Sequence, residues 1–86
     1  MHKTTERFWK CFNKLPKEIQ RISKEQFNLL KNNPHHSSLH FKKVGKVWSI
    51  RVSLDHRALA VKDGDDFIWM WIGTHDEYER IIKILG

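Results

Sequence analysis

The chain has 86 residues and a formal net charge of +6, from 16 Lys and Arg against 10 Asp and Glu. This charge favours a polyanionic partner, and a nucleic acid rather than a membrane, although many small soluble proteins are equally basic. Its length allows one small domain over residues 1–86. A content of 40% hydrophobic and 12% aromatic residues excludes a largely disordered chain. One cysteine excludes an internal disulfide and a cysteine-cluster zinc site, and without a signal peptide or a membrane-length apolar run we expect a cytoplasmic protein.

Helical spacing marks the first part of the chain, where two helices form a predicted hairpin. Its inward positions recur every three or four residues: Phe8, Cys11, Phe12 and Leu15 in and just after residues 4–14, then Ile19, Ile22, Gln26 with Phe27, and Leu30. Pro16 suits the start of the second helix because its φ is fixed, and Pro34 after two asparagines ends that helix. Residues 1–43 carry ten Lys and Arg against three Asp and Glu, so the outer faces are basic.

The period then changes to that of strands, which we predict at residues 39–43, 46–54, 57–62 and 67–73. In the second of these, alternation puts one apolar set on one face and a mixed set on the other: Trp48, Ile50, Val52 and Leu54 against Val47, Ser49, Arg51 and Ser53. Asp63-Gly64 is typical of a hairpin turn. The last strand is apolar on both faces, with Trp69 and Trp71 as core residues, and we expect it in the middle of the sheet.

The chain ends in a predicted helix. Thr74 and Glu77 fit a capping box, in which each side chain accepts from the other residue's backbone N–H. Tyr78, Ile81, Ile82 and Leu85 supply the packing face. The predicted fold class is therefore α+β, with an N-terminal helical hairpin packed on an antiparallel β-meander of three to four strands and a short C-terminal helix.

Several segments carry a family resemblance through their order and spacing: NNP at 32–34, SLHFKKV at 38–44, WSIRV at 48–52, HRALAV at 56–61 and WIGTHDEYERI at 71–81. The series resembles the RelE/ParE superfamily of toxins from type II toxin–antitoxin pairs, and within it the RelE-, YoeB- and HigB-type mRNA interferases. The resemblance implies a RelE-like fold, a cognate antitoxin partner, and cleavage of mRNA on the ribosome without metal or cofactor. Many members begin with a β-strand, which is not predicted here, and Ser49 stands where RelE-type enzymes often place a first catalytic lysine.

In such interferases the RNA 2′-OH attacks the adjacent phosphorus. That reaction needs a base, cations around the phosphoryl oxygens and an acid for the leaving 5′-oxygen. Arg57 matches the arginine that family members place beside the scissile phosphate, and Arg51 is a candidate phosphate clamp, expected near Arg57 across a hairpin. The alternative for Arg51 is a solvated strand residue.

The resemblance also points to His75, which matches a histidine near the C-terminus of YoeB-like members, and to Tyr78, which could stack on a base. A histidine that only occupies the first helical turn and a tyrosine that only packs are the alternatives. Further candidates are expected to contact the RNA backbone: Lys42, Lys43, Lys46 and His56. Taken one at a time, such lysines are more often solvated edge residues, and a histidine in a turn is often simply exposed.

A metal site is not expected, although the chain has six histidines. His36 and His40 are four residues apart, but Pro34 and the following serines argue against a helix there, and no third ligand follows at a zinc-like spacing. Two other functions remain open. One is a ParE-like toxin that inhibits DNA gyrase without cutting RNA, and the other is a non-toxic relative that only binds a partner.

Overall fold

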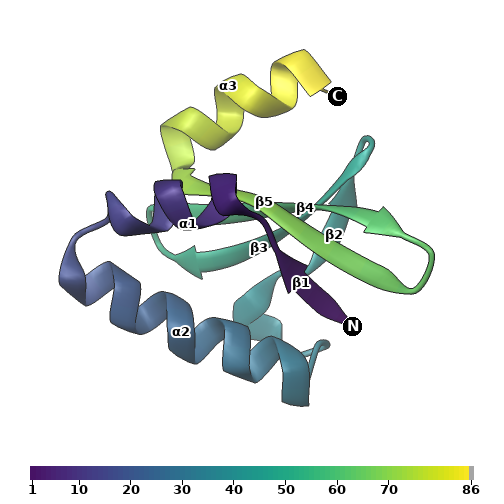
Figure 1. Cartoon of the computed structure of the whole chain (residues 1–86), viewed down its shortest axis with the longest axis horizontal. Helices are drawn as coiled ribbons and strands as arrows, with labels where there is room; N and C mark the ends of the chain where they lie inside the picture. The colour runs from purple at the N-terminus through teal and green to yellow at the C-terminus, as the bar shows by residue number, and fades with distance from the viewer. Residues whose placement is uncertain (86) are drawn as a thin grey trace.

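A mixed five-stranded sheet forms the centre of the computed structural model, which describes residues 1–85 (Figure 1). Its strands, in the spatial order β1-β5-β4-β3-β2, are β1 His2–Thr4, β2 Lys42–Val44, β3 Val47–Ser53, β4 His56–Asp63 and β5 Asp66–Thr74. The helices are α1 Glu6–Asn13, α2 Lys17–Asn32, the short 3-10 helix η1 Ser37–Leu39 and α3 His75–Leu85. The predicted α+β class is confirmed. No helix in residues 1–85 is both long and apolar enough to cross a membrane.

The structure has a first strand, β1, that the sequence did not predict. Residues 2–4 pair in parallel with β5, with Thr4 opposite Trp69, so the sheet is mixed and β5 is an inner strand flanked by β1 and β4. Three residues are too few to show an alternating pattern. The strand is held by its backbone pairing and by His2, whose ring stacks on Phe67 at 5.4 Å and accepts a hydrogen bond from the Trp69 indole.

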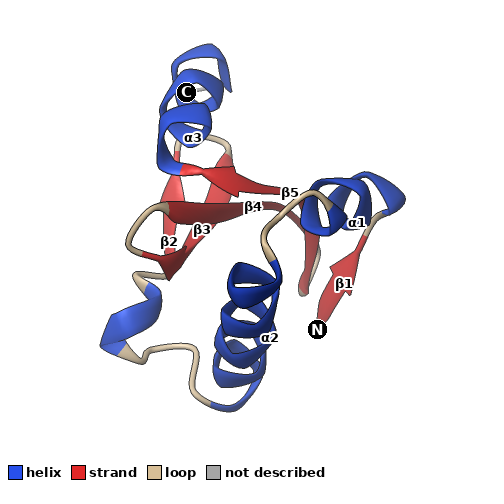
Figure 2. Cartoon of the chain, turned by 90° about the vertical axis from the view of Figure 1, so that its left-hand side faces the viewer, coloured by secondary structure: helices blue, strands red, loops and turns tan. Residues whose placement is uncertain are grey.

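The helical hairpin packs on one face of this sheet (Figure 2). α1 begins later than predicted, because Thr5 caps it by accepting from the N–H of Phe8, while Thr4 belongs to β1. α2 ends at Asn32, as predicted. The core beneath the two helices consists of buried residues from both layers: Phe8, Phe12, Leu30, Leu39, Ile50, Val52, Ala58, Ala60, Trp69 and Ile72.

Two apolar residues at strand ends lie elsewhere than predicted. Leu39 belongs to η1 rather than to a strand and is fully buried, and β2 begins only at Lys42. His40 between them has a φ of +46° and breaks the extended conformation. Leu54 is not on the core face but 82% exposed, because β3 ends at Ser53 and the chain turns there.

The second face of the sheet is also covered. α3 packs a second cluster against it, formed by Val47, Leu59, Trp71 and Tyr78. Ser49, which shares this face with Val47, is consequently only 2% exposed. The pairing of β4 with β5 skips Met70, which is the extra residue of a β-bulge. Because of this bulge Trp69 and Trp71 are both buried, one in the cluster on each face of the sheet. The prediction that both are core residues is confirmed.

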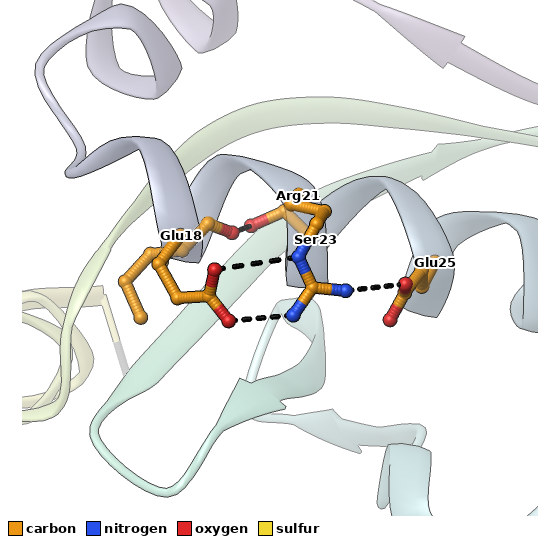
Figure 3. Close-up of polar contacts among 5 residues, drawn as sticks. Glu18, Arg21, Ser23 and Glu25 are labelled. Atoms are coloured by element: carbon orange, nitrogen blue, oxygen red, sulfur yellow. Dashed lines mark hydrogen bonds and ion pairs between the residues drawn. The ribbon is translucent and has the colours of Figure 1, made fainter.

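The outer surface of α2 carries an ion-pair triad (Figure 3). The guanidinium of Arg21 lies between the carboxylates of Glu18 and Glu25, one turn to either side along the helix. On the opposite side of the helix Ser23 is fully buried, and its hydroxyl donates to the carbonyl of Ile19 at 2.7 Å. Part of the basic charge of the N-terminal half is therefore neutralised within α2 itself.

Candidate active site

Two arginines face each other across the β3–β4 pair. Arg51 and Arg57 are direct partners in the antiparallel register, so their side chains leave the same face of the sheet, as the sequence predicts. The register shifts between Arg51 and Ser53, where β3 has a bulge. Bulges bend a strand and redirect its side chains. Both arginines are half-buried at this end of the sheet.

Neutral acceptors hold the Arg57 side chain. Its Nη1 donates to the carbonyl oxygens of Ser53 and His56, both at 3.1 Å. Burial, and secondly the neighbouring charge of Arg51, lower the pKa of Arg57. In residues 1–85 no carboxylate forms an ion pair with either arginine. Two cations at adjacent positions, neither of them in an ion pair, can bind an anion that accepts several hydrogen bonds.

The start of α3 lies beside this pair. The predicted capping box is present: the backbone N–H of Thr74 donates to Glu77 Oε1 at 3.0 Å, and the N–H of Glu77 donates back to Thr74 Oγ1 at 3.3 Å. The N–H of His75 donates to the carbonyl of Asp55, at 2.7 Å, in the turn between β3 and β4. This bond joins the start of the helix to the strand end that carries the arginines.

His75 and Tyr78 occupy the first turn of α3, with their ring centroids 5.9 Å apart. Nε2 of His75 lies 3.4 Å from Glu79 Oε1, and both side chains are more than a third exposed. The Tyr78 ring packs in the second core cluster and is 8% exposed. Its hydroxyl makes no hydrogen bond within residues 1–85, and no buried side-chain polar atom there lacks a partner, so the hydroxyl reaches solvent. The charges of Tyr78 and Glu79 act on that of Arg57.

The other predicted site residues are spread more widely. Lys42 pairs with Ser49 and shares the face of the arginines, whereas Lys43 pairs with Trp48 and points to the face covered by α1 and α2. Lys46 lies in the β2–β3 turn. His56 is buried at the start of β4, and its Nδ1 lies 2.9 Å from Ser53 Oγ.

Two residues at the site escaped the sequence analysis. His40 was considered only as a metal ligand, but its Nε2 lies 3.4 Å from Nη1 of Arg51. Gln26, on α2, donates to the carbonyl oxygen of Arg51 at 3.1 Å. No pattern in the sequence indicates either contact, because His40 is a left-handed residue outside β2 and Gln26 lies on a different element from Arg51. Residues 1–85 contain no group of three or more potential metal ligands.

Comparison with known proteins identifies the family and the fold. Residues 17–80 match the family model of the ParE-like toxin domain. No curated protein sequence matches the chain significantly. Among solved structures, the RelB–RelE antitoxin–toxin complex of Methanococcus jannaschii superposes with a TM-score of 0.72 at 17% identity, over 92% of this chain and 96% of that one.

Two further structures are similar. YafQ from E. coli strain BL21(DE3) gives a TM-score of 0.68 at 16% identity, over 91% of this chain and 96% of that one. The isolated E. coli RelE toxin gives 0.61 at 15% identity, over 99% and 98% of the two chains. These likenesses establish the RelE-like fold. Since the family model covers most of the chain, the protein belongs to the ParE-like toxin domain family.

Proposed function

We propose that the protein is a toxin that cleaves mRNA on the ribosome, without metal or cofactor. The observation that carries this proposal is the cross-strand pair Arg51–Arg57, two cations with no carboxylate partner in residues 1–85. Charge develops on the phosphoryl oxygens during RNA cleavage, and guanidinium groups fixed beside those oxygens lower the barrier. The RelE-like fold supports the same function, because the resemblance that implies mRNA cleavage also implies this fold.

In the proposed reaction the 2′-OH of the substrate attacks the adjacent phosphorus. The new bond joins the 2′-oxygen to phosphorus while the bond from phosphorus to the 5′-oxygen breaks, giving a 2′,3′-cyclic phosphate and a 5′-hydroxyl. One group takes the 2′-proton and another supplies a proton to the 5′-oxygen. His75 and Tyr78 are the candidates for these transfers, and Arg51 and Arg57 bind the phosphoryl oxygens. Lys42 and Lys46 extend the basic surface along the RNA backbone.

The test is addition of the protein to a cell-free translation reaction, followed by mapping of mRNA ends. We expect cuts with 5′-hydroxyl and cyclic phosphate termini. Arg57→Ala should slow cleavage about 10²–10³-fold, and Arg57→Lys, which keeps the charge but loses the planar fork, should also be impaired. The matched control is Arg21→Ala, which removes an arginine whose charge is already paired with Glu18 and Glu25.

Equal inhibition by folded Arg57→Ala would contradict the mechanism. Inhibition of DNA gyrase supercoiling, with mRNA left intact, would instead favour the gyrase-directed alternative. Full translation and full gyrase activity in the presence of the wild-type protein would favour a non-toxic partner-binding relative. Each outcome therefore selects one of the three functions.

We also propose a cognate antitoxin as partner, because two similar structures are of toxin–antitoxin complexes. A cleft of about 710 Å³ between α1, α2 and β1 supports this proposal. Its walls include Trp69 and Phe27, and Lys24 and Lys31 lie at its rim. An acidic segment with apolar side chains, folding as it binds, matches this lining. The test is whether a small acidic protein encoded beside the toxin co-purifies with it and restores translation.

A further inference from the structure

The contact between His40 and Arg51 is part of the site but has no role in the reaction described so far. Antiparallel pairing of Lys42 with Ser49 brings residue 40 opposite Arg51, two residues along each chain. There, Nη1 of Arg51 lies 3.4 Å from Nε2 of the His40 imidazole. Because Arg57 is the β4 partner of Arg51, the side chains of His40, Arg51 and Arg57 lie in one row across the sheet.

The residues on either side of His40 pack in or against the core. Leu39 before it is fully buried, and the Phe41 ring after it packs 5.2 Å from the rings of Trp48 and Phe67. His40 itself has a φ of +46° and ends η1, with its N–H directed at the carbonyl of Ser37. Histidine is one of the few residues enriched in this left-handed region. His40 thus lies between two packed residues, although its own side chain is exposed.

The donor and the acceptor of this contact follow from the chemistry of the two groups. A guanidinium has only N–H donors, so Nε2 of His40 must accept, and the imidazole proton is then on Nδ1. At the other end of Arg51, Gln26 donates to its carbonyl oxygen at the bulge. Arg51 is therefore held by a neutral ring at its side chain and by a neutral amide at its backbone.

Charge distinguishes this arrangement from an ordinary ion pair. Arg21 on α2 is held by two carboxylates, which cancel its charge. Arg57 is held by two backbone carbonyls, and Arg51 by an imidazole, neither of which carries a negative charge. Both arginines of the site are fixed in place while their charge stays available to an anion. Fixed donors that need no rearrangement are what transition-state stabilisation requires.

We propose that His40 is a positioning residue that holds the guanidinium of Arg51 without neutralising it, so that the remaining N–H groups of Arg51 bind a phosphate of the RNA substrate. This role rests on the proposed function. His40 acts through Arg51 and transfers no proton itself.

The test compares His40→Gln with His40→Met. Glutamine places an acceptor oxygen close to the position of Nε2, and methionine has a similar length without a strong acceptor. Both variants introduce the same backbone strain at a positive φ. Equal urea midpoints would show that the two variants are equally stable, so that a difference in their activity reflects the contact with Arg51. We expect His40→Met to lower kcat/KM for mRNA cleavage about tenfold, and His40→Gln to remain within about twofold of wild type.

The coupling to Arg51 is measured by a double-mutant cycle. In an Arg51→Ala background, His40→Met should cause no further loss of cleavage, because the group that it positions is absent. A purely structural role for His40 would still lower activity in that background. Equal activity of the Gln and Met variants, or an undiminished effect of His40→Met without Arg51, would overturn the proposal.

A measurement that does not require cleavage separates this proposal from the proposed function. NMR relaxation of the Arg51 side-chain Nε–H group reports its order directly. We expect that order to fall in His40→Met and to persist in His40→Gln. If the wild-type protein leaves mRNA intact, the nuclease function is wrong, and with it the substrate named here. If Arg51 is equally ordered in both variants, the positioning role is wrong whatever the protein cleaves.

Discussion

The carboxylate of Glu77 lies where a side chain on Gly73 would have to go. A Cβ on Gly73 would be 2.9 Å from Oε1 of Glu77 and 2.4 Å from the indole carbon Cζ2 of Trp71. Gly73 is also the β5 partner of Arg57. The close packing of strand, helix cap and arginine at this point depends on the absence of that side chain.

Gly73→Ala should therefore loosen the start of α3. We expect a loss of about 1–3 kcal/mol from overpacking, with faster amide hydrogen exchange in the first turn of α3. The comparison is Gly64→Ala in the β4–β5 turn, where φ is +60° but nothing lies within 4 Å of a Cβ. That change should cost about 1–2 kcal/mol through backbone strain alone and leave exchange in α3 unchanged. Equal exchange profiles for the two variants would contradict the packing argument.

The capping box makes stability depend on pH. The N–H of Thr74, and then its hydroxyl, donate to Glu77 and lower the pKa of that carboxyl. A lowered pKa stabilises the fold above the ordinary value of 4.5, and this stabilisation is lost as the pH falls through the lower folded value. Glu77→Gln should accordingly have a lower urea midpoint than wild type at pH 7, and the two midpoints should converge in acid. A constant difference across this range would show that the carboxylate charge is not responsible.

Arg51→Gln should change stability and RNA binding in opposite directions. Like charges directly opposite each other in a sheet are unfavourable, so removing one should raise the free energy of unfolding by about 0.2–1 kcal/mol. The loss of one phosphate contact should reduce the slope of log affinity for single-stranded RNA against log salt by about 0.7. Lys83→Gln, which removes a positive charge from the far end of α3, is the control. An unchanged salt slope in Arg51→Gln would argue against a phosphate contact.

Two substitutions separate the packing role of Tyr78 from a role in the reaction. The ring is buried and the hydroxyl reaches solvent. Tyr78→Phe should leave the free energy of unfolding within about 0.5 kcal/mol of wild type, whereas Tyr78→Ala should cost about 3–5 kcal/mol through the cavity it leaves. If the hydroxyl takes part in proton transfer, Tyr78→Phe should also slow cleavage by about 10²-fold. Full activity of Tyr78→Phe would reduce Tyr78 to a core residue.

Side-chain periodicity and turn chemistry predicted much of this molecule. The hairpin of α1 and α2, the meander β2 to β5, the capping box and the placement of Arg51 opposite Arg57 follow from short-range patterns. Strand β1 could not be predicted in this way, because a three-residue strand held by parallel backbone pairing leaves no pattern in its side chains. The exposure of Leu54 depends on the residue at which β3 ends, and alternation does not specify strand ends.

The site was predicted less completely than the fold. Arginines on a polar strand face stand out in a sequence, but the groups that hold them do not. The contact of His40 with Arg51 depends on register across the β2–β3 hairpin and on a left-handed backbone. The contact of Gln26 with the Arg51 carbonyl joins two elements that are 25 residues apart. Such neighbours are set by tertiary packing, which short-range patterns do not encode.

The parallel pairing of β1 with β5 has a consequence for the order of assembly. The first strand to be synthesised finds its partner only when residues 67–69 have been added, and His75 and Tyr78 follow later still. Contacts at such separation in sequence form slowly, because the whole intervening chain must be closed into a loop. A growing chain thus lacks the completed sheet until residues 67–69 have been added and lacks α3 until residues 75–85 follow. A chain that has grown only as far as β4 therefore carries Arg51 and Arg57 without the helix that brings His75 and Tyr78 beside them, so the candidate site cannot be complete before the sheet is.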